Sequence, residues 1–211
     1  MSCGVSLSDR RPFVQDGVMS SLDQSHRGGL TSLPNILTLG RIAVIPLVVG
    51  LLFLESPIAR WAVFGVYALA CVTDWLDGKI ARARGEVSPL GRFLDPIADK
   101  LLVAAIILML VAAGDLGGIH VIAAIIILCR ELLVSGLREY LSVLQVPLPV
   151  SKLAKWKTTV QMVALGILLI GPAGPEELAL AGILLFWLAT VLTVITGWDY
   201  LARGLRYMLE S

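Results

Sequence analysis

Cysteine and histidine are scarce in this chain of 211 residues. The three cysteines, Cys3, Cys71 and Cys129, are too few and too scattered for a disulfide framework or a cysteine-ligated metal site. We interpret them as small apolar side chains in or near helices. The two histidines, His26 and His120, fall in a polar N-terminal segment and at the expected outer edge of the protein, so neither is expected to be catalytic.

The chain also lacks internal repeats, low-complexity tracts and the alternating pattern typical of β-strands. Residues 1–32 are rich in Ser, Gly, Asp and Arg and contain no uninterrupted apolar run, which argues against a secretory signal peptide. We expect a mobile cytoplasmic extension over residues 1–32 and one domain over residues 33–211.

What the chain does have is long apolar runs, in a composition that is 57% hydrophobic. Each run approaches the ~20 residues that an α-helix needs to cross a bilayer. The fifth run is the shortest and has to include polar residues near its start to be long enough. The connections on one side are short, which favours antiparallel neighbours. We therefore predict an all-α integral membrane protein, a bundle of six transmembrane helices at residues 35–54, 60–81, 95–113, 119–141, 158–170 and 178–201.

Basic residues gather at one end of this predicted bundle, although the net charge is only +1. They flank the second and fourth connections and follow the last helix, whereas the other connections are mostly acidic. By the positive-inside rule, the basic end and both termini are cytoplasmic. The basic residues are Lys79, Arg82, Arg84, Arg92, Lys100, Arg130, Arg138, Lys152, Lys155, Lys157, Arg203 and Arg206.

Four aspartates lie at this cytoplasmic end in a fixed spacing. Asp74 and Asp77 share one face at the end of the second helix, and Asp95 and Asp99 share one face at the start of the third. Pro96 is expected in the first turn of the third helix. Because carboxylates at a membrane are costly unless they face a cavity, a partner or a metal, we expect the four to converge.

Four converging carboxylates need a cation, and their hard oxygen atoms suit Mg²⁺ or Mn²⁺, with Ca²⁺ as an alternative. Two such ions would clamp a pyrophosphate. Gly78 and Gly91 leave room for a substrate beside these ligands, and Arg82 lies within reach of a phosphate. Ion pairing with Lys79, Arg82 and Lys100 would account for one or two of the aspartates, but not for two same-face pairs flanked by glycines.

The segment from Asp74 to Asp99 resembles the signature of the CDP-alcohol phosphotransferases, integral membrane enzymes of phospholipid synthesis. It matches D-x2-D-G-x2-A-R-x8-G-x3-D-x3-D without a departure. The resemblance implies six transmembrane helices, a homodimer, and two divalent metals held by the aspartates, with Asp99 as the general base toward the acceptor hydroxyl. It also implies that CDP-diacylglycerol binds at Asp74, Asp77, Gly78, Ala81, Arg82 and Gly91.

The acceptor alcohol has to be inferred from other polar residues. Arg130 and Arg138 lie about 80° apart around the fourth helix, and Lys157 shares a face with Gln161 at the start of the fifth. Such a cationic cluster suits an acceptor that carries its own phosphate, whereas a neutral alcohol would not need it. The alternative explanation is positive-inside topology together with lipid headgroup contact.

Three strings narrow the resemblance to the bacterial phosphatidylglycerophosphate synthases. They begin at Pro34, Arg130 and Lys155, and with the aspartates the likeness covers about residues 33–205. The implied reaction joins CDP-diacylglycerol and sn-glycerol 3-phosphate to give phosphatidylglycerophosphate and CMP at the bacterial inner membrane. The implied glycerol-phosphate site comprises Thr38, Arg41, Arg130, Arg138, Lys157 and Gln161, with Glu131, Ser135 and Glu139 orienting the cations or binding glycerol hydroxyls.

Rival interpretations differ in acceptor or in class. A cardiolipin synthase of the CDP-alcohol type would use phosphatidylglycerol, and a phosphatidylinositol-phosphate synthase would use inositol phosphate. A divalent-metal or proton-coupled transporter would have carboxylates spread through the bilayer depth, whereas here they gather at one end. A non-catalytic scaffold leaves the aspartates unexplained, and no nucleic-acid partner is expected.

Overall fold

A computed structural model describes residues 33–84, 89–146 and 151–210 of the chain. For residues 33–37, 75, 77–84, 89–93 and 209–210 it describes the backbone alone. The expected extension over residues 1–32 lies outside the described residues.

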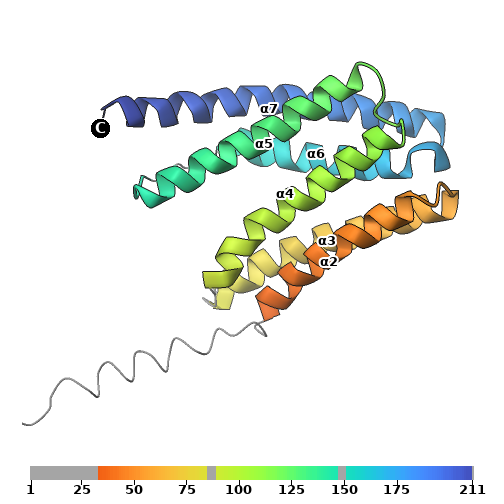
Figure 1. The fold of residues 1–211 in the computed structure, drawn as a ribbon, viewed down its shortest axis with the longest axis horizontal. Coiled ribbons are helices and arrows are strands. Elements are labelled where there is room, and N and C mark those ends of the chain that lie inside the picture. Colours follow the sequence, from red (N-terminus) through yellow and green to blue (C-terminus); the bar gives the residue numbers. More distant parts are fainter. Residues whose placement is uncertain (1–32, 85–88, 147–150, 211) are drawn as a thin grey trace, which may run out of the picture.

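The described residues form six α-helices and one short 3₁₀ helix, with no β-strand among them (Figure 1). The all-α prediction is therefore confirmed, and each predicted apolar segment is helical. The elements are α2 (Leu33–Leu52), α3 (Pro57–Arg84), α4 (Pro89–Ala112), α5 (His120–Val143), α6 (Lys152–Ile170), η2 (Gly171–Ala173) and α7 (Glu176–Glu210).

Several helices are longer than the apolar runs that predicted them, because helical hydrogen bonding continues through polar residues. The N-cap of α6 is Ser151, whose hydroxyl accepts a hydrogen bond from the Ala154 amide at 3.1 Å, so the helix includes the lysines before the apolar run. The start of α4 corrects one expectation. Since α4 begins at Pro89, Pro96 lies inside the helix and not in its first turn.

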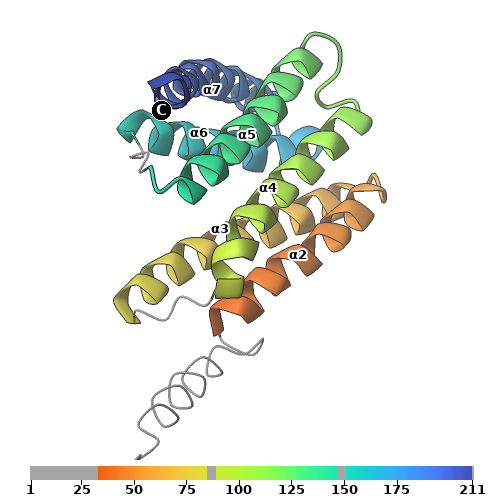
Figure 2. The same cartoon turned by 60° about the vertical axis from the view of Figure 1, so that its left-hand side comes forward.

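The helices pack in two groups, with α2 against both α3 and α4 and with α7 against both α5 and α6 (Figure 2). Contacts between α3 and α6 join the groups. Within the described residues, α3 and α4 do not pack directly on each other, so α2 is the element that brings their side chains together.

One end of the bundle is closed by a buried apolar core and a buried ion pair. We call this the closed end; it contains the α2–α3, α4–α5 and α6–α7 connections. Leu116 of the α4–α5 connection and Phe186 of α7 have no exposed surface. Arg60 near the start of α3 pairs with Asp115, and Gly171 approaches the same guanidinium. Three connections are thereby fastened to one another.

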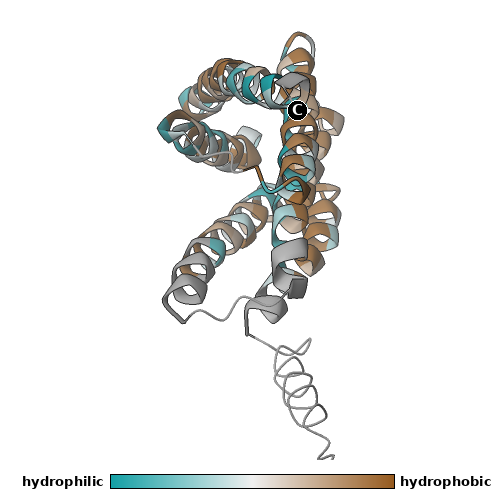
Figure 3. Ribbon diagram, turned by 90° about the vertical axis from the view of Figure 1, so that its left-hand side faces the viewer, coloured by the Kyte–Doolittle hydropathy of each residue, from teal (hydrophilic) through white to brown (hydrophobic). Residues whose placement is uncertain are grey.

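Apolar residues extend along the helices, as the brown stretches in Figure 3 show, and many of the large ones are exposed. Leu69 of α3, Leu108 of α4 and Leu184 of α7 are 68%, 60% and 63% exposed. Among the described residues, α5, α6 continued through η2, and α7 are long and apolar enough to cross a membrane. Membrane crossing by α2, α3 and α4 stays a prediction. Within the described residues, α2 offers only the shorter apolar segment Thr38–Leu52.

Candidate active site

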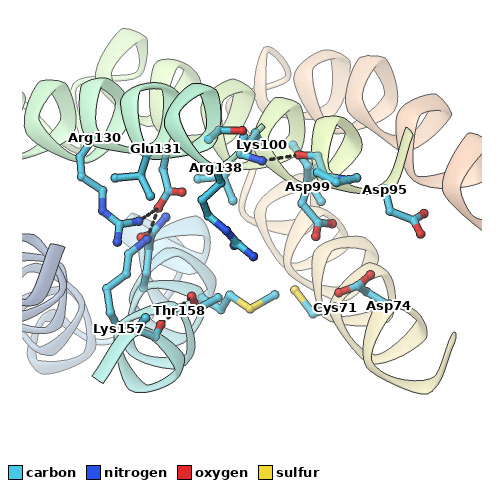
Figure 4. A pocket seen from close by; sticks show the side chains of 18 of the residues that line it. Cys71, Asp74, Asp95, Asp99, Lys100, Arg130, Glu131, Arg138, Lys157 and Thr158 are labelled. Carbon is cyan, nitrogen blue, oxygen red and sulfur yellow. Dashed lines mark hydrogen bonds and ion pairs between the residues drawn. The ribbon is translucent and has the colours of Figure 1, made fainter. Parts of the chain in front are cut away.

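A pocket of about 610 Å³ lies between the two helix groups, at the end of the bundle opposite the closed end. All six α-helices contribute side chains to it (Figure 4). Its charged residues are Arg41, Asp74, Asp95, Asp99, Lys100, Arg130, Glu131, Arg138, Glu139 and Lys157.

An acidic wall is held together by α2. Arg41 is only 6% exposed, and its guanidinium donates to Asp74 of α3 and to Asp99 of α4, each at 2.5 Å. One turn earlier on α2, the hydroxyl of Thr38 donates to Asp95. Because residues three apart on a helix share a face, α2 presents both donors to the same side. We use "acidic wall" for Asp74, Asp95 and Asp99 with Arg41.

The structure places three of the four aspartates against α2, and their convergence around a metal stays a prediction. Asp95 and Asp99 lie one turn apart on α4; Asp74 of α3 shares Arg41 with Asp99, while Asp95 accepts from Thr38. The remaining predicted residues of this frame lie outside the part of the chain whose side chains are described. They are Asp77, Gly78, Ala81, Arg82 and Gly91.

The donor chemistry of the acidic wall fits a hard divalent cation. Its ligands are carboxylate oxygens, and the side chains of Asp74 and Asp99 remain 38% and 50% exposed toward the pocket. The described side chains by themselves contain no group of three or more placed to hold a metal ion. In their present arrangement, two of the carboxylates take their positive partner from Arg41.

A second charged cluster lies on α5 and α6. Glu131 pairs with the buried Lys157 and lies 3.6 Å from a guanidinium nitrogen of Arg130. Another nitrogen of Arg130 donates to the hydroxyl of Thr196 on α7 at 2.9 Å. Gln161, one turn after Lys157, is 4% exposed and also lines the pocket. Three helices therefore fix the positions of these two cations.

Arg138 differs from the other pocket cations. It points between the two clusters in Figure 4, and its side chain has no hydrogen bond or ion pair with any described residue. By contrast, Lys100 donates to the carbonyl of Pro96 at 2.8 Å, and the remaining cations have the side-chain partners given above. A guanidinium exposed to a pocket without a carboxylate partner is chemically suited to bind an anion.

The pocket is electrostatically divided. On the acidic wall, three carboxylates and one arginine leave a formal excess of two negative charges. On the other side, four cations and two carboxylates leave an excess of two positive charges. We call this side the basic wall; its members are Lys100, Arg130, Glu131, Arg138, Glu139 and Lys157.

Most of the expected acceptor residues line this pocket, including Ser135 and Gln161 as well as the charged side chains. Thr38 does not; it is 2% exposed and lies behind Asp95, to which it donates. Its contact with an acceptor stays a prediction, while its observed contact is with a carboxylate.

Sequence reasoning missed several residues of the pocket. Tyr67 and Cys71 precede Asp74 by seven and three residues, so helical periodicity counted backward from Asp74 would have found them. Tyr200 of α7 and Thr196, which contacts Arg130, carry no such signal, because their placement depends on how α7 packs against α5.

Comparison with known proteins agrees with the signature in α3 and α4. The CDP-alcohol phosphatidyltransferase family model matches residues 31–195. This chain belongs to that family. A CDP-diacylglycerol–glycerol-3-phosphate 3-phosphatidyltransferase of Rickettsia bellii is 46% identical over 178 residues, which cover 83% of this chain and 97% of the relative.

Two further relatives of the family differ in the name they carry. A protein of Cereibacter sphaeroides with the same name as the Rickettsia relative is 36% identical over 218 residues, covering 85% of this chain and 98% of the relative. A cardiolipin synthase (CMP-forming) of Oryza sativa is 37% identical over 198 residues, covering 86% of this chain and 60% of the relative. Family membership therefore leaves the acceptor to be argued from the pocket.

Proposed function

We propose that this protein transfers a phosphatidyl group from CDP-diacylglycerol to sn-glycerol 3-phosphate, giving phosphatidylglycerophosphate and CMP. The observation that carries the proposal is that Arg138 has no hydrogen-bond or ion-pair partner among the described residues and lies in a basic wall with two excess positive charges, opposite an acidic wall in the same pocket. A phosphate monoester carries close to two negative charges at neutral pH. The names of the Rickettsia and Cereibacter relatives support the same acceptor.

The charge of the basic wall also separates the candidate acceptors. Glycerol 3-phosphate brings a phosphate monoester, whereas the acceptor of a cardiolipin synthase, phosphatidylglycerol, brings a phosphodiester with a single negative charge. Two excess positive charges match the monoester more closely. The inositol phosphate of a phosphatidylinositol-phosphate synthase is also a monoester, so that rival has to be separated by experiment.

In the proposed reaction, Arg138, Arg130 and Lys157 hold the phosphate of the acceptor, and Gln161, Ser135 and Glu131 face its glycerol part. A hydroxyl oxygen of the acceptor forms a bond to the phosphorus that bears diacylglycerol. The bond from that phosphorus to the CMP oxygen breaks, and CMP leaves. Asp99 takes the hydroxyl proton, a role supported by its half-exposed carboxylate on the pocket wall.

We further propose that Asp74, Asp77, Asp95 and Asp99 hold two divalent ions, Mg²⁺ or Mn²⁺. When bound, such ions neutralise the charge of the pyrophosphate and of the leaving CMP. Two of these carboxylates, Asp74 and Asp99, are paired with Arg41 in the present arrangement, so metal binding would compete with that pairing. The nucleotide part of the donor is proposed to bind along Asp74, Asp77, Gly78, Ala81, Arg82 and Gly91.

The proposal includes a cellular setting. The protein is a homodimer in the bacterial inner membrane, with six helices across the bilayer and with both termini and the pocket on the cytoplasmic side. The basic residues at the pocket end support this orientation. It lets a lipid-bound nucleotide and a water-soluble acceptor meet in one pocket.

An acceptor scan tests the proposed function. Purified protein is incubated with labelled CDP-diacylglycerol and glycerol 3-phosphate, phosphatidylglycerol or inositol 1-phosphate, and the lipid products and CMP are measured. We expect phosphatidylglycerophosphate with glycerol 3-phosphate only, loss of turnover after chelation, and recovery with Mg²⁺ or Mn²⁺. A product from another acceptor and none from glycerol 3-phosphate would contradict the assignment. Metal uptake by reconstituted vesicles without transferase activity would favour the transporter.

A further inference from the structure

One cation of the basic wall is positioned by α7, a helix that contributes no residue to the proposed catalytic set. Arg130 projects from α5, and its guanidinium reaches the hydroxyl of Thr196 at 2.9 Å. The neighbouring residue on α7, Gly197, is buried beneath the aliphatic part of the same side chain. Two adjacent residues of α7 therefore contact the two halves of Arg130.

Thr196 is oriented as an acceptor. Its residue is completely buried, and its hydroxyl donates to the carbonyl of Leu192, one turn earlier, at 2.7 Å. A hydroxyl has one hydrogen, so once that hydrogen points at Leu192, only lone pairs remain for other partners. The nitrogen of Arg130 meets those lone pairs. The α7 backbone thus fixes both the rotamer of Thr196 and the direction from which a cation approaches it.

Gly197 supplies the space that this geometry requires. A Cβ at position 197 would lie 2.9 Å from Cγ of Arg130 and 3.5 Å from its Nε. Cγ is near the root of the side chain, so a rotation of the guanidinium end would not relieve the clash. Any side chain here has to displace the whole Arg130 side chain or push α5 away from α7.

We propose that Thr196 and Gly197 are positioning residues that set the affinity of the enzyme for the phosphate of its acceptor, by fixing Arg130 in the basic wall. The inference rests on the proposed function, because Arg130 and Arg138 are assigned there to that phosphate. In chemical terms, the phosphate monoester is recognised by a guanidinium whose position is fixed by contacts with α7. Donor binding, which involves α3 and α4, does not depend on these two residues.

The test uses the full-length enzyme in detergent micelles and compares four variants. Thr196→Val removes the hydroxyl while keeping its shape, Thr196→Ser keeps the hydroxyl, and Gly197→Ala adds the clashing methyl. Gly182→Ala is the matched steric control, since a Cβ there would lie 2.9 Å from Cγ2 of Ile167, at an apolar α6–α7 contact away from the pocket residues. For each variant, KM for both substrates, kcat and the thermal midpoint are measured.

Thr196→Val and Gly197→Ala are expected to raise KM for glycerol 3-phosphate about tenfold, since each disturbs a charged hydrogen-bonding group. Their KM for CDP-diacylglycerol stays near the wild-type value. Thr196→Ser restores most of the affinity, and Gly182→Ala lowers the thermal midpoint without raising the acceptor KM. If Gly197→Ala does not fold, the Thr196→Val and Thr196→Ser pair decides the question.

Three results would overturn the inference: equal KM values for Thr196→Val and Thr196→Ser, parallel changes for both substrates, or an acceptor effect of Gly182→Ala as large as that of Gly197→Ala. Failure of the proposed function has a different signature, because the wild-type enzyme would then make no product from glycerol 3-phosphate. If it used another phosphorylated alcohol, the same variants measured with that acceptor would still decide the role of α7. An acceptor without a phosphate would overturn both proposals.

Discussion

Each end of the helix bundle is organised around one buried arginine, and the two arginines have opposite surroundings. At the closed end, Arg60 pairs with a single carboxylate, Asp115, and the two side chains are 9% and 13% exposed. At the pocket end, Arg41 is equally buried but divides its guanidinium between Asp74 and Asp99, which are 38% and 50% exposed. The same ionic pairing is thus enclosed at one end and open at the other.

The difference in charge balance and exposure distinguishes an ion pair that stabilises the fold from one that can take part in binding or catalysis. At the closed end one arginine balances one carboxylate and both side chains are largely buried, so the pair fastens the connections together. At the pocket end the carboxylates outnumber their arginine and face a cavity of about 610 Å³. Surplus charge in a cavity is costly unless a cation or a substrate completes it, which is why the pocket end is the candidate site.

The largest effect is expected from Asp99→Asn at the pocket end. An amide cannot take the proton of the acceptor hydroxyl, and loss of a general base typically lowers turnover by about 10²–10⁴-fold. Binding of CDP-diacylglycerol should be largely retained. The measurement is kcat with both substrates saturating, together with equilibrium binding of the donor.

Asp115→Asn is the control for this change, because it makes the same substitution in the enclosed pair. It should lower stability and leave kcat of the folded enzyme unchanged. Substantial residual turnover in Asp99→Asn would remove Asp99 from the role of base.

The second prediction concerns stability. Arg60→Ala leaves Asp115 buried without its partner, and breaking a buried pair in this way typically costs about 3–5 kcal/mol of unfolding free energy. Arg41→Ala should cost less, because Asp74 and Asp99 retain access to water, and added Mn²⁺ should recover the loss. Unfolding of both variants is followed in detergent with and without Mn²⁺.

Removing both members of the enclosed pair sharpens this comparison. Arg60→Met combined with Asp115→Leu replaces the charges by apolar side chains, and it should regain most of the stability that Arg60→Ala loses. Equal losses of unfolding free energy in Arg60→Ala and Arg41→Ala would contradict the distinction between an enclosed and an open ion pair. Recovery of the stability of Arg60→Ala by Mn²⁺ would contradict it as well.

Much of the pocket end could be predicted from spacing within single helices. Periodicity places Asp95 and Asp99 on one face of a helix, and the signature shared with the family fixes their relation to Asp74. The six helical segments also follow from the apolar runs. Their ends were less predictable: α4 begins at Pro89, six residues before the apolar run that predicted it.

The contacts between helices could not be predicted in the same way. In a chain whose helices are apolar on most faces, hydrophobic periodicity does not indicate which face meets which neighbour. The insertion of α2 between α3 and α4, the pairing of Glu131 with Lys157 and the contact of Arg130 with Thr196 all depend on that choice. The pair of Arg60 with Asp115 is equally hidden in the sequence, since the two residues lie 55 positions apart, near the start of α3 and in the α4–α5 connection.

The third prediction tests the basic wall. Arg138→Ala removes the pocket cation that has no described partner, and it should raise KM for glycerol 3-phosphate about tenfold or more. KM for CDP-diacylglycerol should change little. Arg203→Ala is the matched control, since Arg203 is an exposed cation on α7 that does not line the pocket. If Arg138→Ala weakened both substrates equally, or if Arg203→Ala had the same effect, Arg138 would not be the phosphate receptor.

The smallest effect on activity is expected at Gly171, which lies beside Arg60 at the closed end. Its φ of +45° is one that other residues rarely adopt, and a Cβ would lie 3.3 Å from a guanidinium nitrogen of Arg60. Gly171→Ala should therefore cost about 1–3 kcal/mol of stability, with turnover of the folded enzyme unchanged.

Making the same change in the Arg60→Met, Asp115→Leu background separates backbone strain from the contact with Arg60, because the strain is present in both backgrounds and the contact is not. A smaller loss in that background shows that Gly171 is part of the enclosure of Arg60. An equal loss would mean that the turn alone requires glycine and that the arginine is enclosed by α3 and the α4–α5 connection without it.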